Sequence, residues 1–452
     1  MRIRRVTRMS AKNLVSIART RLARFYDSDY YVNYCFTIDA VILAAASRLV
    51  GARPVTCRER PYSVVVLFSA GGNTGDEAML CAFLDNLSTT QDVLLICQDA
   101  SRFAGITDSA SSESRIVVGY SIPGFGVSGA ISRLVHTYRF ARAVKHATDI
   151  GVVGADMVDG IYSPSGSVSR LSILNASARR GVPVALLGFS WSSGAPKNVT
   201  KALRRVSNMS NVNLYVRDPA SYSRLQSLDI YPICRVADMA FSIDVGRAAS
   251  ISTLSCDAIP RNYCIVNVSG LIGARMGGGA VPEYSNLVNT IIESLDIDVV
   301  LVPHVDRQWD SDVAAQLEVA SHLVDERRIQ LVDRRVSVAD ALALVRSSRF
   351  VVTGRMHLGI LALRCGVPAI ILSTQGKVEG LEELMPGLVR SVRPEVGFGA
   401  KVAEVLLQPA FHHHASDPRI ADSSALVDAA EGAARRNFSY SIVGNSLSGS
   451  VV

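Results

Sequence analysis

Three short segments of the sequence combine residue types that can bind an anion or move a proton. The first is residues 69–77, Ser-Ala-Gly-Gly-Asn-Thr-Gly-Asp-Glu, which directly follow the apolar run 64–68. Glycines such as Gly72 and Gly75 let the backbone turn tightly and approach a ligand closely. Asp76 lies where a helix is expected to begin, and it can cap that helix. A glycine-rich turn capped by an aspartate, with no ligand, is an equally valid interpretation.

The other two segments place cationic side chains after apolar runs. Arg217 follows the run 214–216, and an arginine there can clamp a carboxylate or phosphate with two parallel hydrogen bonds. Residues 351–358 read Val-Val-Thr-Gly-Arg-Met-His-Leu, and we expect Arg355 and His357 in the first turn of a helix. Helix N-termini favour anions, so this segment is a predicted anion site. An ion pair for Arg217, and packing or capping for His357, remain alternatives.

Two weaker candidates belong to the same predicted sheet edge. Lys377 follows the run 369–372, and we expect it to face the same site as Arg355. A loop lysine is more often a solvated surface residue. His304 follows the run 299–302 and could line the site, although a loop position without a function is the commoner case.

The sequence indicates neither a metal site nor a disulfide framework. Its two D-x-D pairs, Asp27/Asp29 and Asp310/Asp312, are of a kind that many glycosyltransferases use to hold a metal and nucleotide. The first pair lies outside the strand pattern and the second at an expected helix start, so we predict no metal. The eight cysteines include no C-x-x-C and favour reduced thiols inside the cell.

The elements that must position these residues follow one pattern. The chain has 452 residues, of which 48% are hydrophobic and 19% charged, so it is globular. Ten apolar runs alternate with helical patterns, at residues 64–68, 93–97, 150–153, 184–187, 214–216, 263–268, 299–302, 329–332, 350–352 and 369–372. Such continuous runs indicate parallel sheets covered by helices on both faces. Because small residues and Pro260 interrupt the pattern at 244–261, we predict two Rossmann-like α/β lobes facing a cleft, residues 61–245 and 260–410.

The two ends of the chain differ from these lobes. Residues 1–60 contain 12 Lys/Arg and 4 Asp/Glu, and the rest of the chain is nearly neutral, which argues against a nucleic-acid binder. If residues 1–26 are helical, they form a basic amphipathic helix that could lie on an anionic membrane or pack on its own domain. No apolar run approaches the roughly 20 residues of a membrane-spanning helix, and we expect a cytoplasmic protein. Residues 411–452 are expected to be a tail with little fixed structure.

These segments, in this order, resemble the polysaccharide pyruvyl transferase family. The family motifs are a G-N-x-G-D-E loop, a V-R-D followed by a serine and an Ala-Asp, and an R-[LM]-H followed by G-V-P and a lysine. Here they stand at Gly72–Glu77, at Val216–Asp218 with Ser221 and Ala237-Asp238, and at Arg355–His357 with Gly366–Pro368 and Lys377. The likeness covers roughly residues 62–390. Gln375-Gly376-Lys377 departs from the Asp-Pro-Lys frequent in the family.

The resemblance implies a GT-B-like fold and an enzyme that moves the pyruvyl group of phosphoenolpyruvate onto a glycan. The product is a ketal that bridges two sugar hydroxyls, and phosphate is released. The implied donor-binding residues are Arg217, Arg355 and Lys377. The predicted catalytic residues are His357 and Asp76, and the predicted acceptor-binding residues are Gly72, Asn73, Gly75, Glu77 and His304. No cofactor is expected, and a lipid-linked acceptor at the inner face of the plasma membrane would suit the basic extension.

Two other functions fit the same architecture. A glycosyltransferase would bind a UDP- or GDP-sugar, in the C-terminal lobe. A non-enzymatic scaffold of envelope-glycan assembly would bind neither donor. Phosphate release from phosphoenolpyruvate separates the pyruvyl transferase from both.

Overall fold

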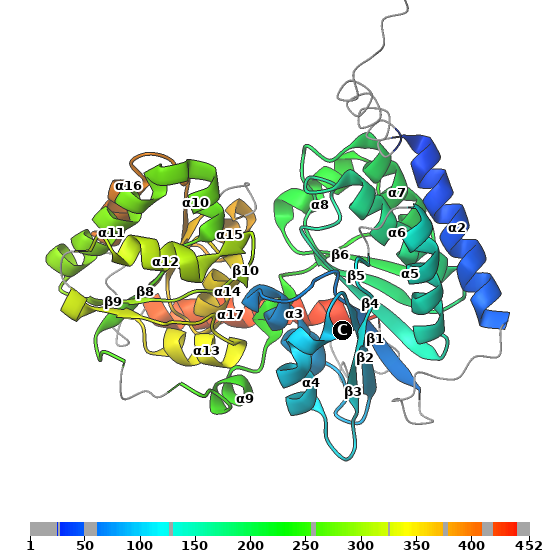
Figure 1. Cartoon of the computed structure of the whole chain (residues 1–452), viewed down its shortest axis with the longest axis horizontal. Coiled ribbons are helices and arrows are strands. Elements are labelled where there is room, and N and C mark those ends of the chain that lie inside the picture. The colour runs from blue at the N-terminus through cyan, green and yellow to red at the C-terminus, as the bar shows by residue number, and fades with distance from the viewer. Residues whose placement is uncertain are drawn as a thin grey trace, which may run out of the picture.

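The computed structural model describes residues 25, 28–48, 61–125, 130–254, 259–323, 326–373, 378–408 and 419–440. These residues form two α/β lobes that lie side by side (Figure 1). The predicted basic helix of residues 1–26 and the predicted donor residue Lys377 lie outside the described residues, Phe25 excepted.

The first lobe is built on a seven-stranded parallel sheet in the order β3-β2-β1-β4-β5-β6-β7. Its strands are β1 (Tyr62–Val66), β2 (Asp92–Cys97), β3 (Val117–Ser121), β4 (Ala147–Ala155), β5 (Val184–Phe189), β6 (Val212–Val216) and β7 (Cys234–Arg235). Its helices are α2 (Asp29–Arg48), α3 (Thr74–Asp85), α4 (Ala104–Ala110), α5 (Ala130–Ala143), α6 (Pro164–Ala178), α7 (Lys197–Ser207) and α8 (Pro219–Ser227). The 3-10 turns η1 (Ala100–Phe103) and η2 (Met239–Ser242) complete the lobe, and the short helix α9 (Val245–Ser250) that follows η2 packs against α13 of the second lobe.

The second lobe repeats this plan with a six-stranded parallel sheet in the order β12-β9-β8-β13-β14-β15. Its strands are β8 (Tyr263–Asn267), β9 (Asp298–Leu301), β12 (Ile329–Leu331), β13 (Val351–Thr353), β14 (Ala369–Leu372) and β15 (Val389–Val392). Its helices are α10 (Gly270–Met276), α11 (Ala280–Leu295), α12 (Asp312–Ala320), α13 (Val338–Arg346), α14 (Met356–Arg364), α15 (Glu379–Leu384) and α16 (Phe398–Leu406). A small antiparallel hairpin of β10 (Asp306–Arg307) and β11 (Asp310–Ser311) follows β9.

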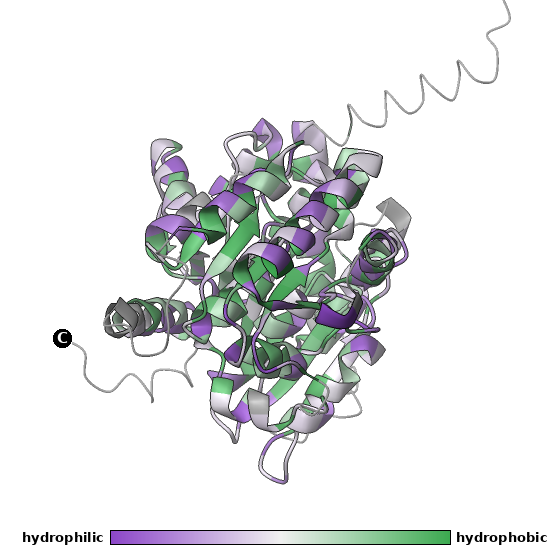
Figure 2. Ribbon diagram, turned by 90° about the vertical axis from the view of Figure 1, so that its left-hand side faces the viewer, coloured by the Kyte–Doolittle hydropathy of each residue, from purple (hydrophilic) through white to green (hydrophobic). Residues whose placement is uncertain are grey.

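All ten predicted strands are present, with ends shifted by up to three residues. Their apolar side chains are buried because helices cover both faces of each sheet, and Figure 2 shows the apolar strands inside more hydrophilic helices. Both α/β sheets were therefore predicted correctly. The edge strands β3, β7 and β15, which carry Gly, Ser or Arg, were missed, and so were the two-residue strands β10 and β11.

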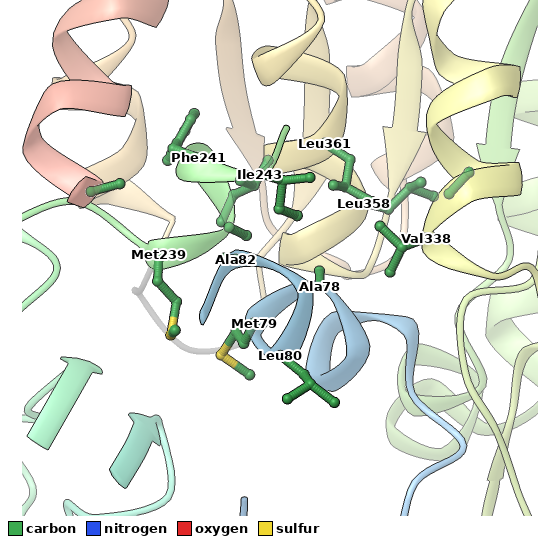
Figure 3. Close-up of a cluster of buried hydrophobic side chains, with 14 of the residues drawn as sticks. Ala78, Met79, Leu80, Ala82, Met239, Phe241, Ile243, Val338, Leu358 and Leu361 are labelled. Atoms are coloured by element: carbon green, nitrogen blue, oxygen red, sulfur yellow. The ribbon is translucent and has the colours of Figure 1, made fainter. Parts of the chain in front are cut away.

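Helix α3 joins the two lobes through a shared apolar core. It follows β1 of the first sheet but packs against α13 and α14 of the second lobe and against η2. Figure 3 shows Ala78 and Ala82 of α3 next to Leu358 and Leu361 of α14, with Ile243 beside them. Because alanine side chains are small, the two helices approach closely, and one continuous cluster of buried side chains spans both lobes.

Part of the basic extension, residues 1–60, packs on the first lobe. The sequence had predicted this extension as a segment separate from the lobe. Helix α2 packs against α5, α6 and α7. Asp39 of α2 is fully buried and forms an ion pair with Arg133 of α5. Thr137 and Ser172 also hydrogen-bond this carboxylate. The four side chains fasten α2 to the lobe, because a buried carboxylate is stable only when it is paired and hydrogen-bonded.

Part of the predicted tail is also ordered. Residues Arg419–Arg435 form α17 and Arg436–Phe438 form η7, which run back to the first lobe (Figure 1). The side chain of Asn437 accepts a hydrogen bond from the N–H of Gly188 at 2.9 Å and donates one to the carbonyl of Ala237 at 3.0 Å. The chain therefore returns to the lobe in which it began. Within the described residues, no helix is long and apolar enough to cross a membrane.

Candidate active site at the lobe boundary

The topology places two of the three predicted segments at matching points of the two sheets. Strand order reverses between β1 and β4 in the first sheet and between β8 and β13 in the second. In open parallel sheets, ligands bind at such switch points, outside the carboxyl ends of the strands. The glycine-rich loop follows β1, and Arg355 and His357 follow β13. Arg217 follows β6 in the first sheet.

The centre of the site is a buried carboxylate that pairs with an arginine and lies next to a histidine. Asp238 Oδ2 lies 2.6 Å from Nη1 of Arg217 and 3.6 Å from Nε2 of His357. Nε of Arg217 donates to Oγ of Ser190, which follows β5, at 2.8 Å. No partner for Nη2 of Arg217 is found among the described residues, so this group can donate to a ligand. The predicted donor residue and the predicted catalytic histidine, which belong to different lobes, thus meet on one carboxylate.

The charges in this cluster stabilise one another. Burial alone would raise the pKa of Asp238, but His357 and Arg217 together hold it well below the ordinary aspartate value. Burial would lower the pKa of Arg217, and the carboxylates of Asp238, Asp156 and Asp218 more than offset that effect. Asp238 and Arg217 are therefore a charged pair in a nearly dry environment, where electrostatic interactions are strong.

Gly75 brings the glycine-rich loop against His357. A Cβ added at Gly75 would lie 2.5 Å from Nδ1 of the imidazole, closer than real Cβ atoms approach. Asn73 caps α3, because its side-chain oxygen accepts a hydrogen bond from the N–H of Gly75 at 2.9 Å. The predicted acceptor loop therefore lies directly beside the predicted catalytic histidine.

Asp76 organises the loop. Its carboxylate accepts hydrogen bonds from Oγ of Ser69 at 2.5 Å and from Nη2 of Arg307, in the second lobe, at 2.8 Å. Nε of Arg307 also donates to the carbonyl of Gly71 at 2.9 Å. Gly72 accepts a hydrogen bond from the N–H of Asp306 at 2.9 Å, at a φ of +75° that favours glycine. Both oxygens of Asp76 serve these contacts and that of Asn73 at 3.2 Å, so its role in this arrangement is to fix the loop.

Glu77 forms the second ion pair across the boundary. Its Oε1 lies 2.7 Å from Nη2 of Arg335, and Nη1 of the same arginine donates to Oγ1 of Thr74 at 3.0 Å. Burial raises the pKa of Glu77, even though Arg335 acts in the opposite direction. The carboxylate of Glu77 is therefore buried between the lobes and depends on the positive charge of Arg335.

Arg355 lies one residue outside the position predicted for it. It is the N-cap of α14 and not part of the first turn, which His357 occupies. Its guanidinium donates to Asp310 at 2.9 Å and to Asp312 at 2.6 Å, and these two carboxylates raise its pKa despite its burial. The second D-x-D pair therefore binds an arginine, and the positive charge of Arg355 is already balanced. The described residues contain no group of three or more metal-ligating side chains.

Comparison with known proteins identifies the chain. A sequence model of the family described as polysaccharide pyruvyl transferase matches residues 73–376. The chain belongs to the polysaccharide pyruvyl transferase family. The matched range runs from Asn73 in the glycine-rich loop through Arg217 and His357, and it ends one residue before Lys377. No curated protein sequence matches this family member.

Solved structures show the architecture that this family member shares with other proteins. MnaA of S. aureus bound to UDP has a TM-score of 0.57 at 12% identity, covering 83% of this chain and 94% of that one. A UDP-N-acetylglucosamine 2-epimerase has a TM-score of 0.54 at 14% identity, covering 83% and 94%. A putative epimerase of this kind from Listeria monocytogenes has a TM-score of 0.52 at 14% identity, covering 86% and 95%. The prediction of a GT-B-like fold is confirmed.

His304 occupies an unusual place in this family member. It is 1% exposed, and neither ring nitrogen has a hydrogen-bond partner among the described residues. Burial, together with the nearby charges of His357, Arg355 and Arg335, holds its pKa well below the ordinary histidine value. Its carbonyl accepts hydrogen bonds from the N–H and Oγ1 of Thr74 at 3.1 and 3.0 Å. His304 therefore contributes a neutral ring, and its backbone joins the lobes.

Sequence reasoning missed three residues that shape the site. Asp238 was noted as part of a motif but given no role, and Arg307 and Arg335 were not singled out. Each acts through a partner far away in the chain, as Arg307 does with Asp76, 231 residues apart. The one available signal was the family motif that pairs Arg217 with the Ala-Asp of Asp238.

Proposed function

We propose that this family member transfers the pyruvyl group of phosphoenolpyruvate to two hydroxyls of one sugar and releases phosphate. The observation that carries this proposal is the carboxylate of Asp238, which holds Arg217 and His357 from different lobes within 3.6 Å. An anionic donor needs a fixed cation, and ketal formation needs a group that moves protons. Arg217 is the fixed cation and His357 is the group that moves protons, and both lie next to Asp238.

Each residue of the site has a separate role in the proposed reaction. Nη2 of Arg217 donates to the carboxylate or phosphate of phosphoenolpyruvate, and the ion pair with Asp238 fixes the guanidinium beforehand. A sugar oxygen forms a bond to C2 of the donor while a proton reaches the methylene carbon, which becomes the methyl group. A second oxygen of the sugar then forms a bond to C2 as the bond to the phosphate oxygen breaks. Of the two hydroxyl protons, one is accounted for by the methyl group and the other leaves with phosphate.

His357 is the proposed proton-transfer group. Its ring is beside the glycine-rich loop on one side and Asp238 on the other. The carboxylate of Asp238, 3.6 Å from Nε2, faces the ring, which is proposed to take up a hydroxyl proton and release it during the reaction. Asp76 and Glu77 hold the loop against the second lobe, and the loop with Gly72, Asn73 and Gly75 is the proposed acceptor side. Arg355 and Lys377 are retained as donor-binding proposals.

The proposed acceptor is a cell-surface polysaccharide precursor or a lipid-linked sugar. The strongly basic residues 1–26 support contact with an anionic membrane surface, which corresponds to the cytoplasmic side of the plasma membrane. Neither a metal nor a cofactor is needed for the steps above.

Donor binding is the first test. Saturation at about 100 times the dissociation constant adds roughly 2.7 kcal/mol to stability, so phosphoenolpyruvate should raise the melting temperature of the wild type. Arg217→Met should remove that rise, whereas the matched control Arg328→Met, at a partly exposed ion pair, should keep it. A rise with UDP- or GDP-sugars alone would instead indicate a glycosyltransferase. Phosphate release that requires both phosphoenolpyruvate and a glycan acceptor would confirm the reaction, and its absence with all acceptors would reject it.

A further inference from the structure

One large aromatic side chain beside the site is exposed. Trp309, in the turn between β10 and β11, is 74% exposed. The chain has one other tryptophan, Trp191, which is 1% exposed. Single exposed apolar side chains are common on protein surfaces and need no function. The surroundings of Trp309 are what distinguish it.

A fixed cation supports the indole ring. The guanidinium carbon of Arg307 lies 5.7 Å from the ring centroid of Trp309, within the range of a cation–π contact. The same guanidinium donates to the carbonyl of Gly71 and to the carboxylate of Asp76, at 2.9 and 2.8 Å. The side chain of Arg307 therefore connects Trp309 to the glycine-rich loop.

The second strand of the hairpin is tied to the site as well. Asp310, next to Trp309 in the chain, accepts a hydrogen bond from Nη1 of Arg355 at 2.9 Å. Asp306, at the other end of the turn, accepts one from Oγ of Ser311 at 2.8 Å. Both strands of the turn are therefore anchored, and the indole is exposed on a fixed support.

We propose that Trp309 is a stacking platform for a pyranose ring of the acceptor glycan. This inference rests on the proposed function, because it names a subsite of the same active site. The face of an indole is electron-rich, and the C–H groups on one face of a pyranose ring carry slight positive charge, so the two surfaces attract and exclude water. A sugar on this platform lies beside the loop that Asp76 organises.

The charges around the indole favour a sugar over a membrane as the occupant. Asp306 is exposed at one end of the turn, and its carboxylate would be repelled by anionic lipids. A neutral glycan meets no such repulsion.

Fluorescence measures this subsite without relying on turnover. Acrylamide quenches an exposed tryptophan, and Trp309 is the exposed one of the two, so the quenching reports on this residue. We would titrate the wild type with methyl glucosides, methyl galactosides, N-acetylhexosamines and their β-linked disaccharides. At least one sugar should reduce the quenching by half or more. No protection by any of these sugars, or protection by anionic phosphatidylglycerol vesicles instead, would overturn the proposal.

Steady-state kinetics then tests the stacking platform separately from the proposed reaction. In phosphate release, Trp309→Ala should raise the KM of the acceptor about tenfold, the equivalent of about 1.4 kcal/mol, and leave the KM of phosphoenolpyruvate unchanged. Trp309→Phe keeps an aromatic face and should lose less than threefold. Tyr30→Ala, at an 80% exposed tyrosine of α2, is the control and should change neither constant. If the wild type releases no phosphate, the proposed function fails. If it does and Trp309→Ala keeps the wild-type acceptor KM, the stacking platform alone is refuted.

Discussion

Replacing Asp238 by asparagine tests the central cluster, because the change removes one charge and almost no volume. Breaking a buried ion pair by removing one partner costs about 3–5 kcal/mol. We expect the lower end, about 3 kcal/mol, since Asp156 and Asp218 also attract the charge of Arg217 and asparagine can still accept its hydrogen bond. For lobes of this size, about 1 kcal/mol corresponds to roughly 2–4 °C, so Asp238→Asn should melt about 6–12 °C lower.

The control is the same substitution at an exposed pair. Asp296 is 93% exposed at its side chain and lies 2.7 Å from Nη1 of Arg328. Such pairs contribute about 0–1 kcal/mol, so Asp296→Asn should melt within about 4 °C of the wild type. Scanning calorimetry of both variants measures the difference. A shift for Asp238→Asn no larger than that of the control would refute the charged, buried pair.

The pH dependence of stability tests independently whether Asp238 is negatively charged in the folded protein. The pKa of Asp238 in the folded protein is lower than in the unfolded chain, so the stability that its charge provides is fully present above about pH 4. It is lost as the pH falls through the folded value. The gap in melting temperature between the wild type and Asp238→Asn should therefore stay constant from pH 8 to 5 and shrink only below about pH 4.

Two further predictions concern polar side chains buried at the lobe boundary. His304→Leu removes two ring nitrogens that have no partner among the described residues, so we expect a melting temperature within about 3 °C of the wild type; a larger loss would mean that the ring forms hydrogen bonds. Asn437→Ala leaves the N–H of Gly188 and the carbonyl of Ala237 unpaired, so we expect a loss of about 2 kcal/mol and a melting temperature about 4–8 °C lower. An unchanged melting temperature for Asn437→Ala would show that α17 and η7 do not stabilise the first lobe.

The sheets were predictable because their strands are continuous apolar runs. A buried parallel strand leaves a local signal of this kind, and each of the ten runs became a strand. Helix α17 left no such signal. It packs through small and scattered side chains, with Val427, Ala430 and Ala434 buried, so its sequence reads as a polar tail. The docking of α2 depends on Asp39 meeting Arg133, a pair 94 residues apart.

The sequence indicated several of the residues that cluster at the lobe boundary, but not the ion pairs that they form. Motif and strand-edge reasoning selected Arg217 and His357, and the structure brings them together. It also selected Arg355 as an anion-binding cation and discounted Asp310/Asp312 as a metal site, and the structure joins the three residues in ion pairs. Ion pairs between lobes depend on how two sheets are placed, and no local pattern of residues encodes that placement.

These pairings bear on how the proposed anionic donor would be attracted to the site. Among the described residues at the boundary, Arg217, Arg307, Arg335 and Arg355 each face a carboxylate within 2.8 Å. Those carboxylates belong to Asp238, Asp76, Glu77, Asp310 and Asp312. The arginines are therefore fixed in orientation but largely balanced in charge. The proposed donor, with a carboxylate and a phosphate, would therefore gain little net attraction from these four pairs alone. Donor binding by Lys377, which the family resemblance implies, therefore remains a proposal that this charge balance favours.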